Sequence, residues 1–153
     1  MNLIEAVLKL RSSGYPSGGE VQKKEFNDGS TGFHVESGGF KYVDRYHGFN
    51  PFAGSELLFD SRDELLWVMH YYGEVLSNES DPEKIYSFLR EALLQGSYEY
   101  PFRGPANLEI RHFKYENRQY GSFDRFHGTE TIFEKDNKVY RLYYHGGRMK
   151  KTI

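Results

Sequence analysis

Apolar residues recur at every third or fourth position in two short segments, which is the period of an amphipathic helix. The first segment follows the candidate N-cap Asn2 and ends at Gly14, and Ile4, Val7, Leu8 and Arg11 recur in it at helical spacing. The second follows Asp81 and Pro82 and ends at Gly96, and its stripe is Ile85, Phe88, Leu89, Ala92 and Leu93. An Asn or Asp cap, an early proline and a terminal glycine are typical helix boundaries.

Most of the remaining chain alternates between apolar and polar positions, which predicts strands. The segments 40–73 and 113–146 share this pattern, and Gly54, Glu56 and Phe59 recur as Gly128, Glu130 and Phe133. The alternation also places two matching triplets on the faces expected to form the core: Trp67, Met69 and Tyr71 in the first segment, and Tyr140, Leu142 and Tyr144 in the second.

We therefore predict an α+β fold of duplicated helix-plus-antiparallel-strand units, with two helices packed on antiparallel sheet about a pseudo-two-fold axis. The chain is expected to be a single domain over residues 1–153, with repeat halves at approximately 1–77 and 78–153. Two further strands around residues 19–26 and 31–38 interrupt the symmetry of the first half. This asymmetry predicts a single site in place of two.

Composition excludes several classes of protein. Twenty basic and twenty-two acidic residues leave a net charge of −2, so direct DNA binding is not expected. The chain contains no Cys, which rules out disulfides, Cys-ligated zinc and thiol nucleophiles. No signal peptide or membrane-spanning stretch is evident, so a cytoplasmic protein without membrane contact is expected. No cofactor is predicted, and the oligomeric state is left open.

Aromatic residues are abundant, with thirteen Tyr, twelve Phe and one Trp. They favour strands, and Tyr also suits ligand pockets because its apolar ring carries a polar tip. The loops after the two predicted helices, YPSGGE at 15–20 and PFRGP at 101–105, are expected to meet in one cleft. The predicted ligand-binding residues are Tyr15, Gly18, Gly19, Tyr46, Tyr72 and Arg103.

Arg103 has two interpretations. It could bind an anionic ligand together with the Gly18–Gly19 backbone, because guanidinium groups suit carboxylates and phosphates. It could instead pair with Glu56 or Glu130, since glutamates in strands need a partner. The second, structural interpretation is favoured.

Catalytic and metal-binding motifs are missing from the sequence. The six histidines have no metal-ligand spacing, and a site shared by His47 and His127 would also need Asp44 and Asp124. No GxSxG elbow occurs. Catalytic residues are therefore left unassigned and no metal site is predicted, with Glu56, Asp44 or a histidine as the candidate acid or base.

Several segments carry a resemblance to a known family: YPSGGE, FKYVDRYHGFNPFAGSELLF, WVMHYYG, PFRGP and the closing YHGG. Together they resemble a bacterial domain family of unknown function, over residues from about 3 to 148. Its members occur alone or fused C-terminal to XRE-type helix-turn-helix regulators, and His70 stands where the family usually has Asn. The resemblance implies a sensor-like role without implying a reaction.

These features favour a small-molecule-binding domain, as a sensor or a sequestering protein, for a polar or anionic ligand of which a nucleotide is one candidate. Two alternatives stay open. One is a small hydrolase or isomerase acting on such a ligand. The other is a protein-interaction or inhibitor module from a mobile element.

Overall fold

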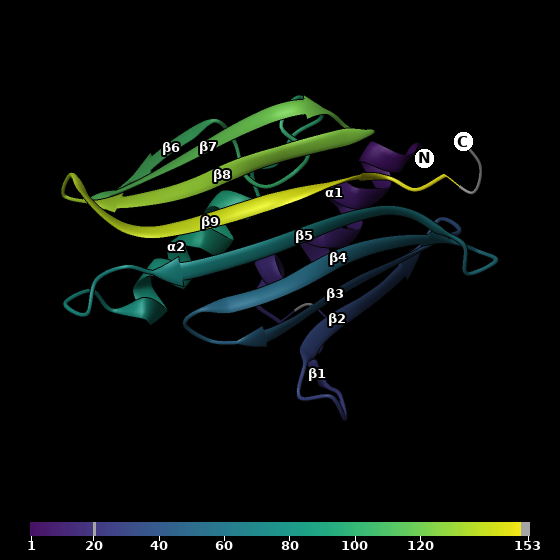
Figure 1. The fold of residues 1–153 in the computed structure, drawn as a ribbon, viewed down its shortest axis with the longest axis horizontal. Helices are drawn as coiled ribbons and strands as arrows, with labels where there is room; N and C mark the ends of the chain where they lie inside the picture. The colour runs from purple at the N-terminus through teal and green to yellow at the C-terminus, as the bar shows by residue number, and fades with distance from the viewer. Residues whose placement is uncertain (20, 151–153) are drawn as a thin grey trace.

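A computed structural model describes residues 1–19 and 21–150. In these residues nine strands form one antiparallel sheet in the order β1-β2-β3-β4-β5-β9-β8-β7-β6 (Figure 1). The strands are β1 (Lys24–Glu25), β2 (Thr31–Ser37), β3 (Phe40–Gly48), β4 (Phe52–Asp60), β5 (Leu65–Val75), β6 (Asn107–Ile110), β7 (Phe113–Ser122), β8 (Arg125–Glu134) and β9 (Asn137–Arg148). Strands β5 and β9 pair at its centre, where Tyr71 lies opposite Tyr144.

Two α-helices and one short 3₁₀ helix accompany the sheet in the described chain: α1 (Leu3–Ser13), η1 (Tyr15–Ser17) and α2 (Pro82–Leu93). The predicted caps are confirmed, since the Asn2 side chain accepts from the Glu5 N–H and the Asp81 side chain accepts from the Glu83 N–H. The buried face of α1 is shifted from the predicted stripe and consists of Ala6, Val7, Leu10 and Arg11.

The predicted α+β class with duplicated units is wrong, because the protein is mainly β. Its two α-helices are short, and both lie behind the same face of one continuous sheet (Figure 1). The error has a physical reason. The stripe of α2 was correctly identified, but each helix covers only part of a sheet that runs unbroken from β1 to β6, so the strands do not divide into two helix-plus-strand units.

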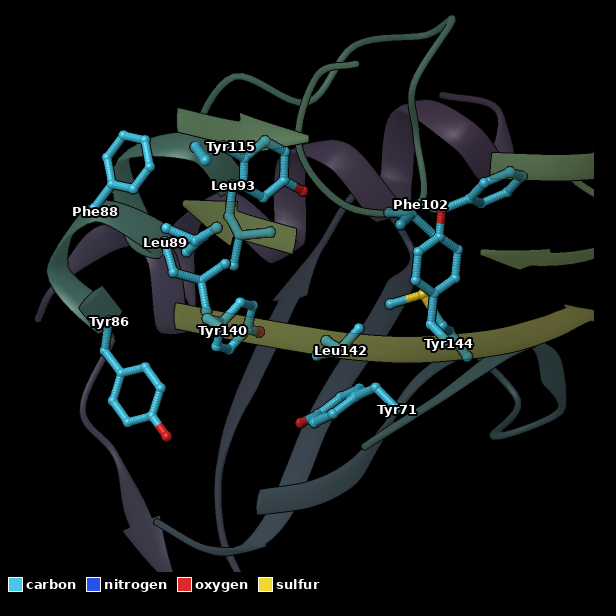
Figure 2. Packing of buried hydrophobic residues seen from close by; sticks show 14 of the residues in the cluster. Tyr71, Tyr86, Phe88, Leu89, Leu93, Phe102, Tyr115, Tyr140, Leu142 and Tyr144 are labelled. Atoms are coloured by element: carbon cyan, nitrogen blue, oxygen red, sulfur yellow. The ribbon is translucent and has the colours of Figure 1, made fainter. Parts of the chain in front are cut away.

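The core lies between this sheet face and the helices, and its aromatic residues were correctly predicted. Trp67 is fully buried and its ring stacks on Phe123 and Phe126, with centroid separations of 5.3 and 5.5 Å. Figure 2 shows that Tyr140, Leu142 and Tyr144 of β9 enter the same core as the apolar side chains of α2. None of the helices in the described ranges is long and apolar enough to cross a membrane.

Candidate functional site

Two buried ion pairs lie on the helix-facing side of the sheet. Arg11 of α1 holds Glu56 of β4 through Nε and Nη2, with N···O distances of 2.9 and 2.7 Å to Oε2. Arg103 holds Glu130 of β8 through Nε and Nη2, at 3.0 and 2.9 Å. The fork of an arginine matches both oxygens of a carboxylate, so each buried glutamate is charge-compensated.

Glu130 is the better satisfied of the two glutamates. It also accepts hydrogen bonds from the hydroxyls of Tyr115 at 2.6 Å and Tyr140 at 2.9 Å. The structural interpretation of Arg103 is thus confirmed: its side chain is 5 % exposed and already bound to a core carboxylate. The sequence signal for this pairing was the presence of glutamate at core-facing strand positions.

Asp44 of β3 is the third carboxyl in this region, and it has a different environment. It is 7 % exposed, and it lies directly opposite Glu56 across the β3–β4 pair. The Tyr71 hydroxyl donates to Asp44 Oδ1 at 2.5 Å. In the described part of the chain no basic side chain donates a hydrogen bond to Asp44 or forms an ion pair with it, although the charges of Arg103 and Arg11 act from a distance to lower its pKa.

Asp44 lines a cavity of about 330 Å³ between the sheet and α2. Its walls are largely aromatic, and the rings come from η1, three strands, the β3–β4 loop and α2: Tyr15, Tyr46, Phe49, Phe52, Tyr71 and Tyr86. Edge-to-face contacts fix these rings, as between Phe52 and Tyr71 at 6.0 Å, and the Tyr86 hydroxyl donates to the Phe49 carbonyl at 2.5 Å. A concave space that combines aromatic walls with a few buried polar groups, here Asp44 and Arg103, is the usual form of a small-molecule site.

Burial changes the protonation chemistry of this cavity. Removal from water raises the pKa of Asp44 to about 7, and the negative charge of Glu56 acts in the same direction. Burial, followed by the charge of Asp44, also raises the pKa of Tyr46 to about 12. The Tyr46 phenol is therefore neutral near pH 7, whereas Asp44 exists in both its protonated and ionised forms.

Charged residues gather toward α2 and the segment after η1. Arg90, Lys23 and Glu83 line the cavity there, and the Arg90 guanidinium lies 4.9 Å from the centroid of the Tyr15 ring. Among the described residues no carboxylate lies within ion-pair distance of Arg90. A second cavity of about 530 Å³ shares Tyr15, Lys23 and Arg90 with the first.

The structure distributes the predicted site residues over three places. Tyr15, Tyr46 and Arg103 line the main cavity, and Gly18 and Gly19 line the adjoining one. The predicted YPSGGE loop ends at Glu20, which lies outside the described residues.

Tyr72 does not join the other predicted site residues. It is 48 % exposed, and the alternation of β5 points it to the face opposite Tyr71. Both candidate loops follow helices and so lie on the helix side of the sheet, which a side chain on the other face cannot reach.

Two residues that line the cavity are not among the binding residues predicted from the sequence. Asp44 was considered only as a metal ligand or acid–base group, although the alternation of β3 places it on the core face with Tyr42 and Tyr46. An acidic residue at a core-facing strand position was the available signal. Arg90 was not singled out, because a basic residue in the last turn of a helix is common.

Histidine-based metal binding finds no support in the geometry. His47 lies near the end of β3, where its Nε2 contacts the Asp28 carbonyl at 3.1 Å, whereas His127 of β8 pairs with His145 of β9. Strands β3 and β8 are separated by three others in the sheet. Within residues 1–19 and 21–150 no cluster of three or more His, Cys, Asp or Glu side chains could hold a metal ion.

The fold and cavity define a mainly-β domain with a buried carboxyl at an aromatic cavity. A family model described as a domain of unknown function, DUF5680, matches residues 44–149. The chain belongs to this family, and the match begins at Asp44 itself. Comparisons with curated proteins and with solved structures find no significant match.

Proposed function

We propose that this protein binds a small polar molecule in the cavity between the sheet and α2. The observation that carries the proposal is Asp44: a buried carboxyl with one hydroxyl donor, facing a cavity of about 330 Å³. Buried carboxyls in proteins are normally paired, and a perturbed one in a cavity is a typical binding or catalytic group.

We assign the binding of an anionic group on the ligand to Arg90 and Lys23, and not to Arg103. Arg103 is already bound by Glu130, whereas Arg90 has no carboxylate partner in the described chain and borders both cavities. A nucleotide suits this arrangement, because the aromatic walls can stack on a base while Arg90 and Lys23 face its phosphate.

In this role the domain acts in the bacterial cytoplasm. Where it is fused to an XRE-type helix-turn-helix it reports its ligand to the regulator, and as a separate protein it sequesters the ligand. Both roles follow from reversible binding at one cavity.

A second candidate function is catalysis, and the pKa of Asp44 favours it. A carboxyl that titrates at about 7 can donate or accept a proton near neutral pH, which suits a general acid or base in a hydrolase or isomerase. Binding and catalysis would use the same cavity and the same side chain.

Native mass spectrometry of the freshly purified protein tests the proposal. We expect a small molecule to co-purify with the wild type and with Tyr72→Ser, but not with Asp44→Asn. Recovery of that molecule unchanged after incubation supports binding, whereas a changed mass indicates catalysis. A wild-type protein that carries no small molecule, and whose melting temperature no compound in a metabolite library raises, contradicts both functions.

A further inference from the structure

The buried polar layer beside the cavity contains one more acidic than basic group. Its carboxyls are Asp44, Glu56 and Glu130, and its guanidiniums are Arg11 and Arg103. Arg11 uses its Nη1 on the Pro101 carbonyl at 2.6 Å and its other nitrogens on Glu56. When Asp44 is ionised, the layer therefore holds an excess negative charge in a low-dielectric region.

The excess charge is located at the cavity. Arg103 does not supply the missing partner, because Nε and Nη2 bind Glu130 and Nη1 lies 3.8 Å from Glu56. Tyr71 occupies Oδ1 of Asp44, and in the described chain no hydrogen bond is made to Oδ2. A ligand that enters the cavity can therefore bind this second oxygen.

Aromatic walls favour a cation at this position. The rings of Tyr15, Tyr46, Phe52 and Tyr86 line the same cavity, and the negative face of an aromatic ring attracts a cationic nitrogen. An anionic group at the same depth would add a further negative charge beside Asp44 and Glu56, without a free guanidinium to receive it.

We infer that the part of the cavity lined by Asp44 selects an organic cation, in which an amidinium, guanidinium or ammonium group on an apolar body pairs with Asp44 and supplies the missing positive charge. This inference rests on the proposed binding function and specifies its ligand class. Arg90, Lys23 and Glu83 have mixed charges and leave room for an anionic substituent elsewhere on the ligand.

Binding of such a cation depends on the ionised form of Asp44. Charged and titratable groups surround this carboxyl from every element packed against it. They are Arg11 from α1, Tyr15 from η1, Lys23, Tyr42 and Tyr46 from β3, Glu56 from β4, Tyr71 from β5, Glu83, Tyr86 and Arg90 from α2, and Arg103. Because the pKa of Asp44 is raised to about 7, the affinity for a permanently charged cation should increase about tenfold between pH 6 and pH 8.

Three probes of matched size and different charge test the inference: benzamidinium, neutral benzamide and anionic benzoate. Isothermal titration calorimetry on the full chain should show benzamidinium binding tightest at pH 8, by about tenfold or more over benzamide, since a buried charged partner is worth over 1.4 kcal/mol. Asp44→Asn should lose both this preference and the pH dependence. Asp136→Asn, at the exposed tip of the β8–β9 hairpin, should retain both.

The possible failures are distinguishable. Equal or tighter binding of benzamide or benzoate to the wild type overturns the cation inference and leaves the binding function intact. Retention of the amidinium preference in a folded Asp44→Asn protein, verified by its circular dichroism and melting transition, also overturns it. Failure of all three probes to bind at millimolar concentrations also overturns the inference, whereas the co-purification and library measurements decide the proposed small-molecule site.

Discussion

Replacing Asp44 with Asn should stabilise the protein above neutral pH, which is an unusual result for a change at a buried polar residue. Burial raises the pKa of Asp44 from its ordinary value of 3.8 to about 7. In the unfolded chain the carboxyl ionises near its ordinary value, so between these two pH values the folded state binds the extra proton. Folding stability must then fall as pH rises through this window.

The size of the effect follows from the same two values. Each unit of pKa difference corresponds to about 1.4 kcal/mol, so the ionised carboxyl destabilises the fold by roughly 4 kcal/mol once the pH exceeds 7. Asn keeps an oxygen that can accept from the Tyr71 hydroxyl, and it removes the charge. The advantage of Asp44→Asn should therefore be roughly 2 kcal/mol at pH 5 and roughly 4 kcal/mol at pH 8.

Urea denaturation at these two pH values provides the measurement, with Asp136→Asn as the control for removing an exposed carboxylate. The control should change the free energy of unfolding by less than about 0.5 kcal/mol. The reasoning is refuted if Asp44→Asn is less stable than the wild type at pH 8, or if its advantage is the same at both pH values. Either result would mean that Asp44 is stably ionised in the folded protein.

Three other substitutions test the core, the ion pair and the open face of the sheet. Arg103→Ala should lower the free energy of unfolding by about 3–5 kcal/mol in urea titrations, since it leaves Glu130 buried without its cation; a loss below about 1 kcal/mol would contradict the structural role. Trp67→Ala should also lower the free energy of unfolding by about 3–5 kcal/mol, because the Trp67 ring is fully buried; a loss below about 1 kcal/mol would mean that the ring lies at the surface. Tyr72→Ser should change the free energy of unfolding by less than about 0.5 kcal/mol and should still co-purify with the ligand; loss of the ligand would mean that Tyr72 belongs to the binding site.

The sequence predicted local structure better than the arrangement of the elements. Helix caps at Asn2 and Asp81 depend on residues within one turn, and the burial of Trp67 follows from alternation along one strand. The fold class, in contrast, depends on which strands pair with one another and on which face of the sheet the helices cover. Those pairings join residues far apart in the chain, such as Tyr71 and Tyr144, so periodicity within a segment does not determine them.

The candidate site was predicted in part for the same reason. Tyr15 and Tyr46 were found because aromatic residues beside glycine-rich loops suit a pocket, and both line the cavity. Arg103 was recognised as a core ion pair because buried glutamates need a partner. What the sequence could not reveal is which carboxyl lacks one, since that depends on the three-dimensional positions of Arg11 and Arg103 relative to Asp44.

A comparison within the sheet supports our proposal that Asp44 serves binding. Asn117 of β7 lies opposite Glu130, as Asp44 of β3 lies opposite Glu56. The Tyr144 hydroxyl donates to Asn117 Oδ1 at 2.7 Å, and Asn117 Nδ2 donates to the Gly104 carbonyl at 2.8 Å. A neutral amide at this kind of position thus finds a hydrogen-bond partner within the protein for both its oxygen and its nitrogen.

At the β3 position the hydroxyl contact is kept, through Tyr71, but the side chain is a carboxylic acid that lines the cavity, and its second oxygen accepts no hydrogen bond within the described chain. The charge makes this position destabilising at neutral pH, whereas the fold accepts a neutral amide in the comparable environment of Asn117. Natural proteins retain destabilising groups chiefly where function requires them. In the unliganded protein the ionised Asp44 carboxyl lowers the free energy of unfolding. A ligand cation that pairs with Asp44 would remove the excess negative charge and so restore much of this lost stability. The restored stability should then appear as part of the ligand's binding free energy.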